Sequence, residues 1–125
     1  MLTGILVKHR RLRLPGDYFS MIASTPAIPY YAVIFTSLRT EGDKGYEAMS
    51  DKMVALAQQQ PGYLGYESAR SETGITVSYW ESLEAIKNWK ANFDHQLAQK
   101  LGKEKWYSQY KIRICKVERD YGFEI

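Results

Sequence analysis

The sequence is poor in the residues on which disulfide and metal chemistry depend. Its one cysteine, Cys115, rules out a disulfide framework within the chain and a zinc site built on several thiolates. Cys115 lies in the alternating run Tyr110 to Val117, which favours a buried and unreactive thiol. His9 and His95 are the only histidines, so a metal site would need one of them together with carboxylates. We therefore expect no metal site.

Several function classes lack their sequence signals. No apolar run approaches the roughly 20 residues of a membrane-spanning helix. The chain has no glycine-rich phosphate loop and no nucleotide or flavin fingerprint. With so few histidines, no Ser-His-Asp or Cys-His order is convincing. We expect a cytoplasmic protein that does not bind a membrane.

The basic charge belongs to the start of the chain. The formal net charge is +3, and the excess lies in residues 1–27, whose basic cluster is Lys8 to Arg13. The remaining residues contain basic and acidic side chains in equal number, which argues against nucleic acid as a partner. The first 27 residues lack the apolar segment of a secretory signal, and Met21 is a plausible natural start. We expect a flexible N-terminal extension over 1–27 and one domain over 28–125.

Four segments have the composition of strands. They are rich in β-branched and aromatic residues and end at turn-forming residues. Gly65 marks a bulge or a close backbone contact in the second of them. The predicted strands are Tyr30–Leu38, Tyr63–Arg70, Ile75–Trp80 and Tyr107–Arg119.

Two segments have helical periodicity. Over Gly45 to Gln60 apolar residues recur at the helical spacing, Asp43 can accept the free N–H groups of the first turn, and Pro61-Gly62 stops the helix. After Ser82 the stripe Ile86, Trp89 and Phe93 predicts a second helix. A continuous helix would place His95 about 180° from Ile86 at ~100° per residue. A break near 91–94 would reset the phase and place His95 on the inward face of a second short helix.

The element order β-α-β-β-α-β predicts a ferredoxin-like α+β domain. In this arrangement two helices cover one face of a four-stranded antiparallel sheet. The other face needs a second layer, which a two-fold homodimer supplies through sheet-on-sheet packing. Ten Tyr, three Trp and four Phe are consistent with strand packing, with the walls of a pocket for a flat ligand, or with both.

Several segments together resemble the antibiotic biosynthesis monooxygenase family. They are Tyr31-Ala-Val-Ile-Phe-Thr-Ser37, Gln60-Pro-Gly-Tyr-Leu-Gly-Tyr-Glu-Ser68, Val77-Ser-Tyr-Trp-Glu-Ser-Leu-Glu-Ala-Ile86, and Trp89 followed by His95. The resemblance implies a dimeric α+β barrel with a pocket in each protomer between the helices and the sheet. It also implies one of several activities: cofactor-independent oxidation of polycyclic phenols to quinones, haem binding or degradation, or none that is established.

The resemblance implies candidate catalytic residues on the second helix. Similar proteins place a tryptophan there against the substrate or a haem plane, which points to Trp89; a plain core tryptophan is the alternative. His95 is a candidate base or axial haem ligand, or else a hydrogen-bonded helix residue. Asn92 is our choice over Asn88 for holding substrate or a peroxide, although a solvated asparagine is the plainer interpretation.

The remaining candidates line the expected pocket. Haem-degrading relatives carry an asparagine on the first strand where this chain has Thr36 and Ser37, which disfavours that activity. Arg39 could hold a substrate anion, but a surface arginine is the simpler interpretation. The expected cofactor is none, with haem as the alternative, and a non-catalytic dimeric binding module is a third hypothesis. The predicted substrate-binding residues, each of which also suits the core or the dimer interface, are Phe35, Met53, Tyr66 and Tyr79.

Overall fold

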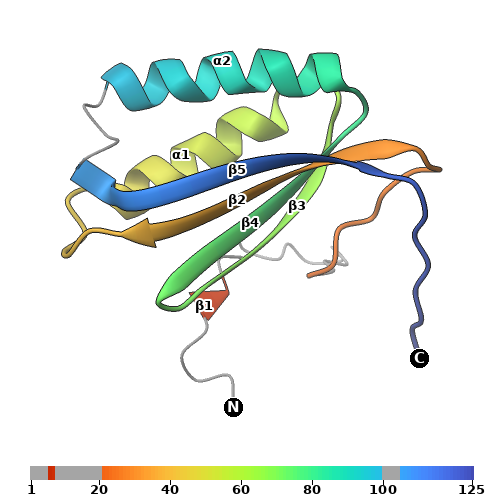
Figure 1. Cartoon of the computed structure of the whole chain (residues 1–125), viewed down its shortest axis with the longest axis horizontal. Helices are drawn as coiled ribbons and strands as arrows, with labels where there is room; N and C mark the ends of the chain where they lie inside the picture. The colour runs from red at the N-terminus through yellow and green to blue at the C-terminus, as the bar shows by residue number, and fades with distance from the viewer. Residues whose placement is uncertain (1–5, 8–20, 100–104) are drawn as a thin grey trace, which may run out of the picture.

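The computed structural model describes residues 6–7, 21–99 and 105–125, in which two helices lie on one face of an antiparallel sheet (Figure 1). The sheet order is β1-β3-β4-β2-β5. Four of these strands are long, and β1 adds a two-residue strand at the edge next to β3. The elements are β1 (Leu6–Val7), β2 (Tyr30–Arg39), α1 (Tyr46–Gln58), β3 (Tyr63–Arg70), β4 (Thr73–Trp80), α2 (Leu83–Gln99) and β5 (Tyr107–Val117).

This arrangement confirms the ferredoxin-like prediction. From β2 onward the order is β-α-β-β-α-β, and both helices cover the same side of the sheet. The four predicted strands agree with β2 to β5 to within two residues at each end. Gly65 lies at a register shift between β3 and β4, and a Cβ there would be 3.2 Å from the Cβ of Ala23. Both features expected of Gly65, a bulge and a close contact, are therefore present.

The register of the strands decides which side chains face the helices. Val33 pairs with Ser78 and Phe35 pairs with Thr76, so these four share the helix-facing side. The residues between them in each strand point to the opposite side of the sheet, where Ile34 pairs with Val77. On the central strand β4, Thr76, Ser78 and the fully buried Trp80 therefore face the helices, whereas Ile75 and Val77 face the other side.

The helix α1 begins where the sequence predicts. The Asp43 carboxylate accepts the backbone N–H of Gly45 at 2.9 Å and that of Glu47 at 3.2 Å. Gly45, in the left-handed region, is the cap residue itself. The apolar stripe of the helix is buried, including Met49 and Met53. The hydrogen bonds of Asp43 thus mark the start of α1, and the amphipathic pattern decides which face of the helix packs on the sheet.

Of the two alternatives for the second helix, the structure has the continuous one. The helix α2 runs without interruption from Leu83 to Gln99, straight through residues 91–94. Its start is capped by Ser82, whose hydroxyl accepts the backbone N–H of Ala85 at 3.1 Å. The segment contains no proline or glycine to interrupt the hydrogen-bond ladder. The reason for expecting His95 to face inward is therefore removed.

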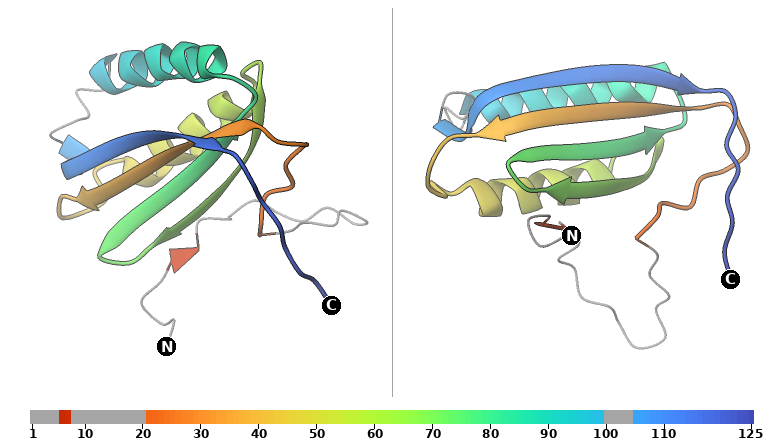
Figure 2. Two further views of the ribbon diagram at one scale, coloured as in Figure 1. Left: turned by 45° about the vertical axis from the view of Figure 1, so that its right-hand side comes forward. Right: turned by 60° about the horizontal axis from the view of Figure 1, so that its bottom comes forward.

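Part of the N-terminal extension contacts the domain. The backbone N–H of Ala23 donates to Glu67 at 2.9 Å, and the Thr25 hydroxyl donates to Tyr30 at 3.0 Å. The segment 21–29 and the tail 118–125 both leave the sheet on the side away from the helices (Figure 2). The expected domain start at residue 28 therefore omits residues that contact the sheet. Within the described residues, no helix has the length and apolar character needed to cross a membrane.

Candidate functional site

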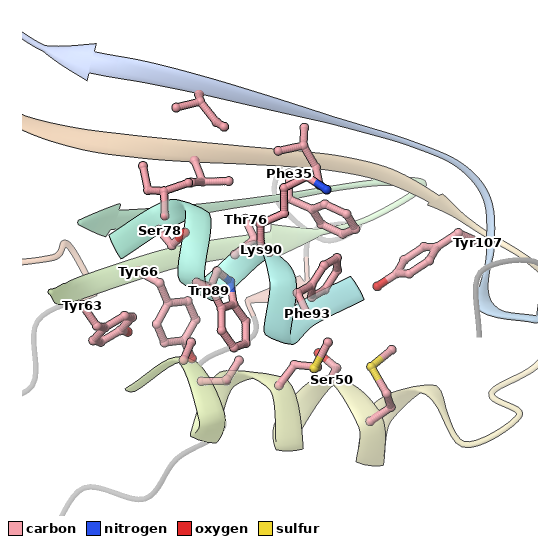
Figure 3. Close-up of a pocket in the computed structure, with 18 of the residues that line it drawn as sticks. Phe35, Ser50, Tyr63, Tyr66, Thr76, Ser78, Trp89, Lys90, Phe93 and Tyr107 are labelled. Carbon is pink, nitrogen blue, oxygen red and sulfur yellow. The ribbon is translucent and has the colours of Figure 1, made fainter. Parts of the chain in front are cut away.

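A cavity of about 140 Å³ lies between the helices and the sheet (Figure 3). It is bounded by α1, by α2 and by the helix-facing side of the strands. Its wall is mostly apolar and aromatic, with few polar groups. The residues that line it are Val33, Phe35, Tyr46, Met49, Ser50, Met53, Val54, Ala57, Tyr63, Tyr66, Thr76, Ser78, Ile86, Trp89, Lys90, Phe93, Tyr107, Ile112 and Ile114.

Trp89 forms the centre of the aromatic wall. Its ring is stacked on Trp80 with centroids 6.1 Å apart and planes 20° apart, and it also contacts Phe93 at 6.1 Å. Phe93 meets Phe35 of β2 edge to face at 5.7 Å. Trp89 also packs against both buried clusters of the core. Trp80, which is fully buried, packs against one side of the Trp89 ring. Trp89 therefore presents its aromatic surface to the cavity in a fixed orientation.

The opposite wall comes from α1 and is adaptable. Met49 and Met53 are buried, one turn apart, and both line the cavity. Methionine has three rotatable bonds and a polarisable sulfur, so such a wall can adjust to ligands of different outline. A flat ligand lying between these methionines and Trp89 would contact an aromatic ring on one side and flexible thioethers on the other.

Four of the predicted site residues meet in this cavity: Phe35, Met53, Tyr66 and Trp89. Tyr79 does not, because it lies on the opposite face of β4, and its hydroxyl donates to Glu67 at 2.8 Å. Its predicted role as a substrate contact in this cavity is therefore corrected.

The polar candidates on α2 are not placed in the cavity. Asn92 is half-buried and is not among the lining residues. His95 falls within α2, but its side chain lies outside the part of the chain that the structure describes. Trp89 is thus the one predicted catalytic residue that the structure brings to the cavity wall.

Tyr46 and Tyr107 were missed by the sequence reasoning. Tyr46 opens α1 and Tyr107 opens β5, and their rings meet at 5.6 Å at one end of the cavity. Burial, together with the nearby Tyr46 hydroxyl, raises the pKa of Tyr107 above its ordinary value, while Arg70 and Arg39 oppose this shift. Tyr107 is therefore a neutral phenol, able to donate a hydrogen bond, at neutral pH. Its position at a strand start, after a lysine-rich segment, gave no signal for a pocket residue.

A second hollow lies on the far face of the sheet. Tyr30 donates to Asp120 there, and Tyr79 donates to Glu67. Burial first, and then the hydrogen bond to Glu67, raises the pKa of Tyr79. Each of these carboxylates already accepts a hydrogen bond from a tyrosine. The hollow is therefore lined by a hydrogen-bond network that holds the terminal segments against the sheet.

The cavity wall is poor in metal and haem ligands. Among the described lining residues there is neither a histidine nor a cysteine. The part of the chain that the structure describes also contains no group of three His, Cys, Asp or Glu side chains suited to a metal ion. The side chain of His95, the expected axial ligand, lies outside the described residues, so we derive no step through haem.

Comparison with known proteins agrees with this geometry. The family model "Antibiotic biosynthesis monooxygenase" matches residues 29–101. The uncharacterised Bacillus subtilis (strain 168) protein YqjZ is 47% identical over 105 residues, which span 82% of this chain and 92% of YqjZ. The region that carries the cavity is therefore shared with an established family.

Solved structures share the fold at low sequence identity. SnoaB, a cofactor-independent oxygenase from Streptomyces nogalater, superposes with a TM-score of 0.62 at 10% identity, covering 74% of this chain and 97% of its own. The Pseudomonas aeruginosa protein PA3566 gives a TM-score of 0.58 at 20% identity, covering 75% and 97%. At these identities the likeness establishes the fold alone.

Proposed function

Because this chain belongs to the antibiotic biosynthesis monooxygenase family, we propose that it is a cofactor-independent monooxygenase acting on a small aromatic or polyketide-like phenol. The observation that carries the proposal is the apolar cavity of about 140 Å³, walled by Trp89 and Phe35 on one side and Met53 on the other. Such a cavity excludes water and accepts a planar ring. The fold shared with SnoaB, itself described as a cofactor-independent oxygenase, adds support.

The proposed reaction converts a phenol and dioxygen into a quinone and water. Loss of the phenolic proton gives an anion with carbanion character at a ring carbon. One electron passes from this anion to dioxygen, and the resulting carbon radical and superoxide combine to form a C–O bond. Protonation gives a hydroperoxide. Cleavage of its O–O bond, with loss of the proton on that carbon, yields the quinone carbonyl and releases water.

Each proposed role follows from the chemistry of the side chain. Trp89 holds the ring of the substrate, since a stacked aromatic contact contributes about 0.5–1.5 kcal/mol beyond burial. His95 is the proposed base, because a neutral imidazole accepts a proton near neutral pH, and the substrate's own acidity is the alternative. Asn92, which does not line the cavity, is given no role in this reaction. The apolar wall around Phe35 and Met53 keeps solvent away from the radical pair.

Oxygen uptake with a panel of polycyclic phenols tests this function. We expect Trp89→Phe to lower kcat/KM about tenfold, which corresponds to about 1.4 kcal/mol of transition-state binding. Trp106→Phe is the control, because Trp106 belongs to the core cluster against which the half-buried Trp89 packs but does not line the cavity. His95→Ala tests the base, and thermal unfolding of each variant separates lost chemistry from lost fold.

The outcomes separate the hypotheses. Equal oxygen uptake by the wild type and Trp89→Phe would remove the role of Trp89. Unchanged uptake in His95→Ala would leave deprotonation to the substrate. Ligand binding without oxygen uptake, across the whole panel, would reject the oxygenase and leave a small-molecule-binding module.

We also propose that the chain forms a homodimer through the sheet face that the helices leave uncovered. The side chains on this face include Ile34, Val77 and Ile75, and Ile75 is 46% exposed. A sheet with apolar side chains on both faces is stable when a second layer covers the open face.

A further inference from the structure

Two arginines stand at the ends of the two strands that flank β4, near one aromatic ring. Arg39 is the last residue of β2 and Arg70 is the last residue of β3. Their guanidinium carbons lie 3.6 Å and 5.9 Å from the centre of the Tyr46 ring. Two cations therefore gather at the end of the molecule where α1 and β5 begin.

Neither guanidinium forms an ion pair within the described part of the chain. Arg39 donates to the carbonyl oxygens of Trp106 at 2.8 Å and Gly42 at 3.2 Å. Arg70 donates through Nη2 to the Ser37 hydroxyl, and its Nη1 is buried without a hydrogen-bond partner. A buried charged donor without a partner costs free energy, and an anion brought nearby offsets that cost.

The position of Arg70 is built into the strand pairing. Gly74 lies across from Arg70 in the β3–β4 hairpin, and Ser37 pairs with Gly74 on the other side. A Cβ at Gly74 would lie 2.0 Å from Nη2 of Arg70, so the absence of a side chain there makes room for the guanidinium. Ser37 is buried and accepts its hydrogen bond. The charge is therefore held in place before any ligand arrives.

Tyr46 and Tyr107 connect this charge to the cavity. Both are 8% exposed, both line the cavity, and their rings meet edge to face. Tyr107 closes one end of the cavity and directs its hydroxyl inward (Figure 3). Arg39 and Arg70 favour negative charge near Tyr107, which opposes the effect of burial on its pKa. The Tyr107 and Tyr46 hydroxyls are hydrogen-bonded to each other, so the pair is a donor group backed by two positive charges.

Lys90, the basic side chain of the described cavity wall, is already engaged. Lys90 forms an ion pair with Asp94 one turn along α2, with 2.6 Å between Nζ and Oδ2. The opposite end of the cavity is apolar or aromatic, with Ala57, Ile86 and Tyr63. The cavity is therefore polarised along its length, with an electropositive end at Tyr46 and Tyr107.

We propose that this end is an anion subsite, in which the pair of Tyr46 and Tyr107 donates a hydrogen bond to an anionic oxygen of the ligand and Arg39 and Arg70 supply the positive field. The inference rests on the proposed function of the cavity and deepens it. The substrate then carries a carboxylate or a phenolate oxygen at this end, while its aromatic body lies against Trp89. Arg70 acts through the tyrosines as a positioning residue.

Calorimetric titration with a matched pair of probes tests the subsite at pH 7. The probes are 2-naphthoate, which is anionic, and 2-naphthamide, which is neutral and of the same shape. We expect the wild type to bind 2-naphthoate at least tenfold more tightly than 2-naphthamide. Tyr107→Phe removes one hydroxyl and keeps the ring, so it lowers this ratio severalfold. Tyr110→Phe is the control, because Tyr110 lies on the same strand but does not line the cavity.

Variants at Arg70 test the charge itself. Arg70→Met lowers the ratio toward one, and Arg70→Lys, which keeps the charge, restores part of it. Because Arg70→Met loses a buried hydrogen bond and risks the fold, Tyr107→Phe remains decisive. Equal binding of both probes by the wild type, or an unchanged ratio in Tyr107→Phe, overturns the subsite and leaves the aromatic cavity standing. Binding of neither probe overturns the cavity as an aromatic site, and the proposed function with it.

Discussion

Buried phenols give single residues of this chain a measurable pH dependence. Burial raises the pKa of Tyr107 above the ordinary value of 10.0, so the folded state holds its proton more tightly than the unfolded state does. The stability from the neutral phenol is complete below pH 10 and is lost as the pH rises beyond it. We predict that the free energy of unfolding falls above pH 10, by up to about 1.4 kcal/mol per pH unit for this group.

Denaturant unfolding between pH 8 and pH 11.5 measures this loss. Tyr107→Phe cannot ionise, so its stability should decline less steeply above pH 10 than that of the wild type. Tyr121→Phe is the control, since Tyr121 is 90% exposed and has no burial to lose. If Tyr107→Phe and the wild type decline in parallel, Tyr107 does not carry the alkaline transition.

At the residue scale, helical periodicity predicted the side chains that the two helices contribute to the cavity wall. Trp89 and Met53 lie on the apolar stripes of their helices, and both line the cavity. The sequence left open which face of the sheet Tyr79 occupies, because β4 does not alternate cleanly between apolar and polar residues. Its Thr76, Ser78 and Trp80 face the helices, whereas Val77 and Tyr79 face away. Aromatic residues therefore occur on both faces of β4, and alternation alone does not choose between them.

At the scale of elements, the close approach of α2 to the turn after α1 predicts a stability change. Gly62 has a φ of +87°, and a Cβ there would lie 2.7 Å from the Cβ of Ala85. We predict that Gly62→Ala destabilises the protein by about 2–5 kcal/mol, because backbone strain of about 1–2 kcal/mol adds to overpacking of about 1–3 kcal/mol. Urea unfolding measures the difference.

A matched glycine separates the two contributions. Gly45 has a similar φ of +84°, but a Cβ there meets nothing within 4 Å. Gly45→Ala should therefore cost the strain alone, and Gly62→Ala should cost more. The double variant Gly62→Ala with Ala85→Gly should recover the overpacking part. Equal losses at the two glycines would mean that the contact with Ala85 relaxes without cost.

Helix ends were predicted more reliably than helix continuity. Asp43, Pro61 and Ser82 each act through a local hydrogen bond or a missing N–H, which short-range sequence shows directly. A break in α2 would have turned His95 inward, but no residue in the helix requires one. A helix that contains no proline or glycine can continue where polar residues interrupt its apolar stripe. Its backbone hydrogen bonds do not depend on which side chains are buried.

At the scale of the whole molecule, the uncovered sheet face predicts the oligomeric state. We expect light scattering to give twice the chain mass of 14.5 kDa. Val77→Asp places a charge at the centre of the apolar face, so the dimer should dissociate because burying an unpaired carboxylate is unfavourable. Leu83→Asp is the matched control, because Leu83 is 55% exposed at the start of α2. A wild type of 14.5 kDa, or a Val77→Asp variant that stays dimeric, would contradict this interface.

The same variant tests whether the cavity depends on the dimer. The cavity lies between the helices and the sheet, whereas the proposed interface lies on the other face of the same strands. Phe35 and Ile34 are consecutive in β2, so one strand contributes alternately to cavity and interface. Because one chain supplies the entire described cavity wall, monomeric Val77→Asp should bind 2-naphthoate within about threefold of the wild-type affinity. A larger loss would mean that sheet-on-sheet packing sets the twist of β2, and with it the width of the cavity between Phe35 and Met53.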